Sequence, residues 1–259
     1  MLDHASVSPD SSGFPDHPHR GQETISYILS GKLKHEDFAG NSGILTAGSL
    51  QFMTAGRGIM HSEMSLPADD GTASEGLQLW VDLPKEKKMC EPRYRDLTSS
   101  EIQEVSADAG RVKVRVISGV SNGVQSRQDL TYTPIWYLDF TVKPGGTVKQ
   151  LLPQGWNAFA YVMAGEVLIS GSQHAVKQFD LVTLEEDGDG FEASVLAHYG
   201  TEARFILVAG QPLDQPVVQH GPFVMTSRAE IVQAVSDFRM RENGFERAAT
   251  WTSRAMKGR

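Results

Sequence analysis

The chain has 259 residues, of which 40% are hydrophobic, and it carries a formal net charge of -8 at pH 7. This length is enough for two domains of about 100 residues, each with its own core. The acidic balance argues against direct nucleic-acid binding, which needs clustered Lys and Arg, and the chain lacks a run of about 18 apolar residues that would predict a membrane span.

Two features of the sequence predict the cellular compartment of the protein. Cys90 is the single cysteine, so no internal disulfide can form, as is typical of a reducing compartment. The opening residues, 1–5, have neither the basic nor the apolar part of a secretory signal. We therefore expect an intracellular protein.

The first motif in the chain is Asp16-His17-Pro18-His19-Arg20-Gly21. Alternate side chains of an extended strand point to the same face, so His17 and His19 can bind one metal ion together. His61 and Glu63 repeat this spacing further along the chain. If the two strands are neighbours, three imidazoles and one carboxylate converge and leave positions open for water, O2 or a substrate oxygen. The sequence therefore predicts a mononuclear non-haem metal site formed by His17, His19, His61 and Glu63.

The residues between the two motifs predict β-structure. The run 23–30 is rich in β-branched and aromatic residues and ends at Gly31, and the segment Gly56-Arg57-Gly58 predicts a turn before His61. This order of His-x-His, Glu and Gly, followed by a Gly-rich turn and His, resembles the two motifs of the cupin superfamily.

Four other polar residues near the motifs are alternative site residues. Glu23 matches the carboxylate of the cupin motif, and we expect it to hydrogen-bond an imidazole from outside the ligand set. His35 follows on the next strand, where a structural role is expected. Arg20 and Arg57 flank the ligands, either as partners of an anion or, as we expect, in exposed salt bridges.

The chain contains an internal repeat. Residues 27–33, Tyr-Ile-Leu-Ser-Gly-Lys-Leu, align with 161–167, Tyr-Val-Met-Ala-Gly-Glu-Val, and 48–52 align with 179–183. Strand-like runs recur through 22–210 without long helical periodicity, which favours a β-sandwich or barrel. The halves therefore resemble duplicated β-domains.

The second half lacks the metal ligands. In this alignment the residues opposite His17, His19, Glu23 and His61 are Leu151, Pro153, Asn157 and Glu192. His174 and His198 fall at neither ligand position, and we expect both at the surface or in hydrogen bonds. The second domain is therefore predicted to be structural.

One helix is predicted near 228–241. Ser227 and Glu230 form a capping box, and apolar residues follow at spacings of three and four: Ile231, Ala234, Val235 and Phe238. With this helix the domain organisation becomes a metal-binding domain (1–97), a connection with an edge strand (98–118), a domain without ligands (119–215) and a C-terminal extension (216–259).

Six stretches together resemble the pirin family of bicupins. They are residues 13–21, 35–38, 53–64, 76–81, 219–225 and 243–247, with the sequences GFPDHPHRG, HEDF, MTAGRGIMHSEM, GLQLWV, QHGPFVM and NGFER. The resemblance implies an all-β fold of two tandem cupin (jelly-roll) barrels with a short C-terminal helix. It also implies one iron ion per chain, Fe(II) or Fe(III), bound by His17, His19, His61 and Glu63.

Two kinds of function follow from this resemblance. Members of the family are reported to have quercetin 2,3-dioxygenase activity, in which O2 opens a flavonol ring and CO is released; Glu63 then either ligates iron or accepts the flavonol proton as the catalytic base. Pirins are also described as iron-dependent nuclear co-regulators that bind transcription factors, not DNA. His220, in Gln-His-Gly-Pro, matches the family but is expected to pack or cap.

The front of the chain differs from the family pattern. Pirins have about thirty more residues before the iron motif, whereas only residues 1–12 precede it here. We therefore expect the N-terminal strands of the first barrel to be missing, with a sheet edge left uncovered.

Overall fold

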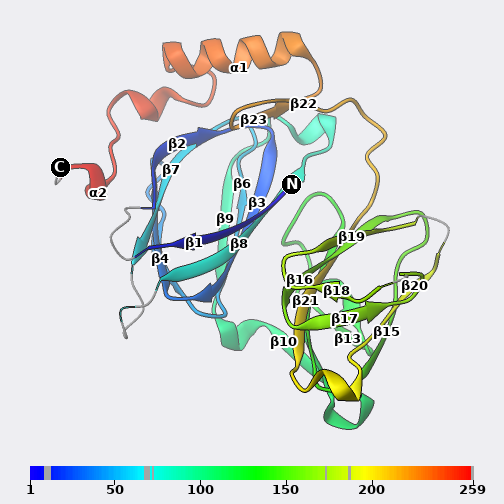
Figure 1. The fold of residues 1–259 in the computed structure, drawn as a ribbon. Coiled ribbons are helices and arrows are strands. Elements are labelled where there is room, and N and C mark those ends of the chain that lie inside the picture. The colour runs from blue at the N-terminus through cyan, green and yellow to red at the C-terminus, as the bar shows by residue number, and fades with distance from the viewer. Residues whose placement is uncertain (9–12, 67–70, 72, 173, 186–187, 258–259) are drawn as a thin grey trace. The chain divides into compact units, whose positions relative to one another are not determined.

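In the computed structural model the chain forms two compact units of antiparallel strands (Figure 1). The structure describes residues 1–8, 13–66, 71, 73–172, 174–185 and 188–257. The first unit contains residues 1–101, 131–133 and 214–259, and the second contains 102–130 and 134–213. The fold is mostly β with a C-terminal helix, as predicted.

The first unit is built on two main sheets. One has the order β1 (Leu2–Val7), β8 (Ser74–Asp82), β3 (Gln22–Ser30), β6 (Leu50–Thr54) and β9 (Arg93–Leu97). The other has the order β2 (Phe14–His19), β7 (Ile59–Leu66), β4 (Lys32–Asp37) and β5 (Ser42–Thr46). From β1 to β4 and from β5 to β8 successive strands alternate between the sheets, which is typical of a jelly roll.

The N-terminal residues form strands of the first unit. Residues 2–7 make β1, which pairs with β8 from Leu2 opposite Leu79 to Val7 opposite Ser74. Residues 14–19 make β2 in the other sheet. The prediction that the N-terminal strands are missing is therefore wrong, because β1 covers the edge of β8.

The second unit also has two main sheets. Its larger sheet has the order β10 (Gln103–Ala107), β11 (Val112–Ser118), β14 (Ile135–Val142), β21 (Ala203–Gly210), β16 (Asn157–Ala164) and β19 (Leu181–Leu184). Its smaller sheet has the order β15 (Thr147–Leu151), β20 (Gly190–Ser194), β17 (Glu166–Ile169) and β18 (Val176–Lys177). A short hairpin adds β12 (Val120–Ser121) and β13 (Val124–Gln125). Phe140, Phe205 and Phe191 pack at the centre of this core.

The two units repeat the same topology, as the sequence repeat predicts. The order β1-β8-β3-β6 corresponds to β14-β21-β16-β19, and β2-β7-β4-β5 corresponds to β15-β20-β17-β18. Tyr27 pairs with Leu50 and Tyr161 pairs with Leu181, in agreement with the predicted alignment. Both ladders also shift register after the same aligned position, Ile28 and Val162.

In the part of the chain that the structure describes, the ladders of each unit form separate open sheets. The expected closed barrels are therefore not seen, and each unit is better described as a pair of sheets.

The C-terminal segment belongs to the first unit. It contains β22 (Val218–His220), β23 (Phe223–Met225), α1 (Arg228–Met240) and α2 (Arg254–Lys257). Ser227 accepts the Glu230 N–H at 3.2 Å, so α1 begins at the predicted cap. Ile231 and Ala234 are buried against Phe223 and Phe245, as the apolar stripe predicts. Among the described residues, no helix is long and apolar enough to cross a membrane.

Short 3-10 helices lie between several of these elements. They are η1 (Lys85–Lys87), η2 (Ser99–Glu101), η3 (Asp108–Gly110), η4 (Ala197–Tyr199) and η5 (Glu246–Ala249).

Candidate metal centre

The strands β2 and β7 are antiparallel neighbours, as the metal-site prediction requires. His17 lies opposite His61 in the ladder, and His19 lies opposite Ile59. The register shifts between Phe14 and His17, which places one extra residue on β2 in a β-bulge. Pro15 lies in this bulge, where a residue without an N–H is tolerated.

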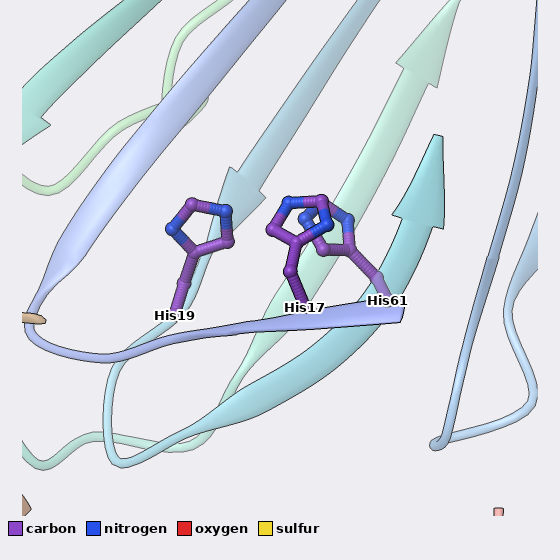
Figure 2. A group of neighbouring side chains, drawn as sticks. All are labelled: His17, His19 and His61. Carbon is purple, nitrogen blue, oxygen red and sulfur yellow. The ribbon is translucent and has the colours of Figure 1, made fainter. Parts of the chain in front are cut away.

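Three imidazoles gather at this point of the ladder (Figure 2). One ring nitrogen from each of His17, His19 and His61 lies within 4.8 Å of the other two. The ring centroids are 4.4 to 5.0 Å apart. Spacing of this kind lets one ion bind all three rings after a small adjustment.

Each ring has its Nδ1 atom engaged by the protein. His17 Nδ1 lies 2.7 Å from the Pro15 carbonyl oxygen, and His61 Nδ1 lies 3.3 Å from the Tyr94 hydroxyl. His19 Nδ1 lies 2.9 Å from the side-chain amide of Gln22. Rotation of that amide by 180° presents Oε1, whose partner is otherwise missing, to an Nδ1–H donor. The remaining nitrogen of each ring, Nε2, is then the available metal-binding atom.

Burial supports this assignment. His19 and His61 are 2% and 1% exposed, and their Nε2 atoms have no hydrogen-bond partner among the described residues. A buried, unpaired nitrogen is costly unless it binds something. Burial, with the neighbouring imidazoles, also holds the pKa of His19 and of His61 well below the usual range, so both rings are neutral near pH 7. Neutral, unpaired imidazoles fit a transition-metal ion.

Glu63 lies beside the three imidazoles. One of its oxygens, Oε2, is 4.0 Å from His61 Nε2. Ser26 donates to the other oxygen, Oε1, at 3.1 Å, and the Gln78 amide donates to Oε2 at 3.0 Å. The carboxylate is thus buried and held next to the imidazoles, and its role as the fourth ligand remains a prediction.

A cavity of about 740 Å³ opens next to this group, and the described residues that line it belong to the first unit. It follows β8 from Trp80, whose ring meets His19 edge-on at 5.2 Å, to Ser74, about 20 Å away along the strand. Its walls are largely apolar and include Ile28, Leu33 and Leu77. Cavities of this size, with few polar groups, are typical of small-molecule sites.

The comparisons with known proteins agree with this architecture. Residues 2–81 match the family model described as Pirin, and residues 137–244 match that of the Pirin C-terminal cupin domain. The chain is 48% identical to human Pirin over 243 residues, which cover 93% of this chain and 81% of that protein. The chain belongs to the pirin family.

Two solved structures extend the comparison. The first is a quercetin 2,3-dioxygenase of Acinetobacter baumannii, with 30% identity and a TM-score of 0.84 over 93% of this chain and 84% of that one. The second is the bacterial pirin YhhW of Escherichia coli in complex with nickel(II), with 20% identity and a TM-score of 0.61 over 82% of this chain and 81% of that one. At 20% identity this second structure is evidence of a shared fold only.

Glu23 has a different role from the one we expected in this pirin-family site. It is 1% exposed, and its carboxylate accepts from Thr54 Oγ1 at 2.6 Å and from the Tyr132 N–H at 2.9 Å. Arg93 lies 3.7 Å away. The expectation that Glu23 bonds an imidazole is therefore wrong: this carboxylate ties residues 131–133 to the first unit.

Arg20 also differs from expectation. It is 1% exposed and donates to Asp237 at 2.6 Å and to the Arg57 and Asn243 carbonyl oxygens at 2.6 and 2.7 Å. The predicted exposed salt bridge is wrong for Arg20, which links the metal-binding strand to α1. For Arg57 the prediction is confirmed by an exposed pair with Glu91 at 3.3 Å.

The remaining histidines lie outside the group. His35 is buried and bonds Asp96 at 2.8 Å, as expected of a structural residue. His174, His198 and His220 are exposed, so His220 is not packed in a core, and its capping role stays a prediction. In the second unit Glu192, aligned with His61, pairs with Lys149 at 3.0 Å. Among the described residues, no group of metal-binding side chains is found there.

Four residues around the imidazoles and Glu63 were not predicted from the sequence. They are Gln22, Ser26, Gln78 and Tyr94, which contact His19, Glu63 and His61. One signal was available: Ser26 and Gln78 fall on the same strand face as the cavity-lining residues Ile28 and Trp80. Tyr94 comes from β9, which has no motif.

Proposed function

We propose that this pirin-family chain is a mononuclear non-haem iron protein that opens flavonols with O2. The observation that carries the proposal is the position of the three imidazoles, two of them (His19 and His61) with unpaired Nε2 atoms, at one end of a largely apolar cavity. The 30% identity to a quercetin 2,3-dioxygenase supports it.

Iron is the metal that we propose, one ion per chain. Imidazole ligands suit Fe, Cu, Ni and Zn, so the donor set narrows the metal without choosing it. His17, His19 and His61 would hold the ion through Nε2, with Glu63 as the proposed fourth ligand. When bound, the metal would supply the Lewis acidity and the one-electron chemistry that O2 needs.

The protein side chains would bind the substrate and move its proton. If Glu63 is the base and not the fourth ligand, its Oε2 would accept the proton of the flavonol hydroxyl group next to the metal, and would return it to the ring-opened product. One O2 is consumed and one CO is released in each turnover, so no external reductant is needed.

The cavity walls fit a flat aromatic substrate. Ile28, Leu33 and Leu77 provide apolar surface, and Trp80 lies at the metal end. The far end is polar and includes Glu75, which pairs with His4 at 2.7 Å. A flavonol has an apolar middle and hydroxyl groups at both ends, which matches this distribution.

The test is anaerobic reconstitution with Fe(II), followed by quercetin and air. The expected result is O2 uptake with equal release of CO and loss of the flavonol absorbance, abolished in His61→Ala and Glu63→Gln but retained in His174→Ala. Iron binding without CO release would reject the dioxygenase.

That negative result would favour the other function that we propose for this family member, an iron-dependent co-regulator of transcription factors in the nucleus or cytoplasm. The net charge of -8 is consistent with protein partners and opposes DNA binding. In that case the bound metal would change the affinity of this protein for a transcription factor, and no flavonol would be turned over.

A further inference from the structure

Trp80 and Gln78 form a hydrogen-bonded chain that ends on Glu63. The Trp80 Nε1–H donates to Gln78 Oε1 at 2.8 Å. The Gln78 Nε2 amide then donates to Glu63 Oε2 at 3.0 Å and to Ser26 Oγ at 3.2 Å. Ser26 Oγ donates to Glu63 Oε1 at 3.1 Å.

The direction of these hydrogen bonds is set by Trp80. An indole N–H can only donate, so it can contact only the oxygen of the Gln78 amide. The amide nitrogen of Gln78 must therefore face Glu63. Trp80 thus determines that the nitrogen of the Gln78 amide, and not its oxygen, faces the Glu63 carboxylate. Trp80 acts on Glu63 through Gln78 and not by a hydrogen bond of its own.

The geometry at Glu63 shows what this chain controls. Both carboxylate oxygens accept hydrogen bonds: Oε2 from Gln78, and Oε1 from Ser26 and, at 3.3 Å, from Gln78 as well. Glu63 is also 3% exposed, so the side chain has little freedom. Its Oε2 atom is held 4.0 Å from His61 Nε2. Ligand atoms about 2 Å from one ion lie roughly 3 to 4 Å apart, so Glu63 Oε2 is held near a ligand position.

We infer that Trp80, acting through Gln78, is a positioning residue that fixes Glu63 beside the metal. Held in this way, the carboxylate needs only a small shift to reach the ion, and little conformational entropy is lost when it binds. The inference rests on the metal site and on the proposed role of Glu63, and does not depend on flavonol turnover.

The experiment uses Co²⁺ as the probe, added to metal-free full-length protein. Co²⁺ has a visible spectrum that depends on the number and type of its ligands. The dissociation constant and the spectrum are measured for the wild type, Trp80→Phe, Gln78→Met and the double variant. Trp136→Phe, a change at a half-buried tryptophan of the second unit, is the matched control.

The expected results follow from the order of the hydrogen bonds, from Trp80 to Gln78 and from Gln78 to Glu63. Trp80→Phe keeps the aromatic contact with His19 but removes the donor, so we expect Co²⁺ to bind about 10- to 100-fold more weakly, with an altered spectrum. Gln78→Met should have at least the same effect. The double variant should equal Gln78→Met, because Trp80 acts through Gln78. Trp136→Phe should match the wild type.

Two results would overturn the inference. One is a Trp80→Phe variant with the affinity and spectrum of the wild type. The other is a double variant whose loss of affinity is the product of the two single losses, since this would mean that the residues act independently. If Gln78→Met does not fold, the NMR signals of the indole N–H groups of the four tryptophans test the hydrogen bond from Trp80 to Gln78. The signal that is absent in Trp80→Phe belongs to Trp80, and this N–H should exchange slowly with solvent in the wild type. Rapid exchange would reject the hydrogen bond.

These outcomes are separate from the test of flavonol turnover. A protein without CO release can still show the effect of Trp80→Phe on Co²⁺, and an active enzyme can lack it.

Discussion

His17 and His61 face each other across the β2–β7 ladder, and the β-bulge at Pro15 and Asp16 immediately precedes this pair. The bulge adds one residue to β2 and sets which residues of that strand lie opposite β7. The positions of the imidazoles therefore depend on strand register, and changes that alter the register or the contacts of these rings should be visible in metal binding.

Metal should stabilise the fold. The unpaired Nε2 atoms of His19 and His61 gain a partner only when an ion binds, and an ion that binds only the native state at 100 times its Kd stabilises by about 2.7 kcal/mol. We expect the midpoint of thermal unfolding to rise when Fe(II) is added without oxygen and to fall with a chelator. An unchanged midpoint would contradict this.

Tyr94 should support metal binding through His61. Its hydroxyl lies 3.3 Å from His61 Nδ1, and burial followed by nearby carboxylates raises the pKa of Tyr94 well above its usual value, so the group stays a neutral phenol. We expect Tyr94→Phe to weaken metal binding by about 10-fold or more. Tyr132→Phe is the control, since a Phe ring keeps the stacking under Arg93 at 3.9 Å; equal affinities in both variants would refute the role of Tyr94.

Gly21 should not tolerate a side chain. It adopts φ 79° just after the ligand strand, and a Cβ atom would lie 2.1 Å from the Val224 carbonyl oxygen. Gly155 has a similar φ of 74° but open space around it. In urea unfolding, Gly155→Ala should cost only the conformational penalty of about 1–2 kcal/mol, and Gly21→Ala should cost clearly more. Equal costs would show that the contact with Val224 can relax.

The buried pair of Arg20 and Asp237 should make stability depend on acid pH. Burial pushes the pKa of Asp237 up, but hydrogen bonds from Arg20, Asn243 and Gln233, with the charge of Arg20, outweigh it and lower the pKa. The folded pKa is thus below the unfolded value of about 3.9. The contribution is complete above that value and is lost as the pH falls through the folded pKa.

Melting curves from pH 7 to pH 3 test this dependence. Asp237→Asn should cost about 3–5 kcal/mol near pH 7, because it leaves the Arg20 charge buried without its partner, and it should flatten the loss of stability below about pH 4. Glu104→Gln, which changes an exposed pair with Lys113, should change little. An acid profile of Asp237→Asn parallel to the wild type would contradict the assignment.

Local patterns predicted much of this structure. The alternation of His17 and His19 and of His61 and Glu63 placed the ligands on one face, because a strand has a period of two. The repeat of residues 27–33 predicted equivalent ladders, because both copies carry the same turn and bulge signals. The helix from Ser227 followed from capping and a 3.6-residue apolar period.

Contacts between distant residues could not be predicted in this way. Arg20 finds Asp237 more than 200 positions away, and nothing local to Arg20 distinguishes a buried ion pair from an exposed one. Glu23 bonds to Tyr132 for the same reason. The N-terminal strands were expected to be missing because of the family pattern, although residues 1–3 resemble the middle of a strand and residues 2–7 form β1.

The most direct test of the three-histidine metal site is the stoichiometry of metal binding in matched histidine variants. Metal-free protein is titrated with Fe(II) under anaerobic conditions, and bound iron is counted after desalting. If His17, His19 and His61 bind one iron ion together, we expect one ion per chain in the wild type and in His174→Ala, and almost none in His17→Ala, His19→Ala or His61→Ala. Wild-type protein that binds no iron, or His61→Ala that still binds one ion tightly, would contradict it.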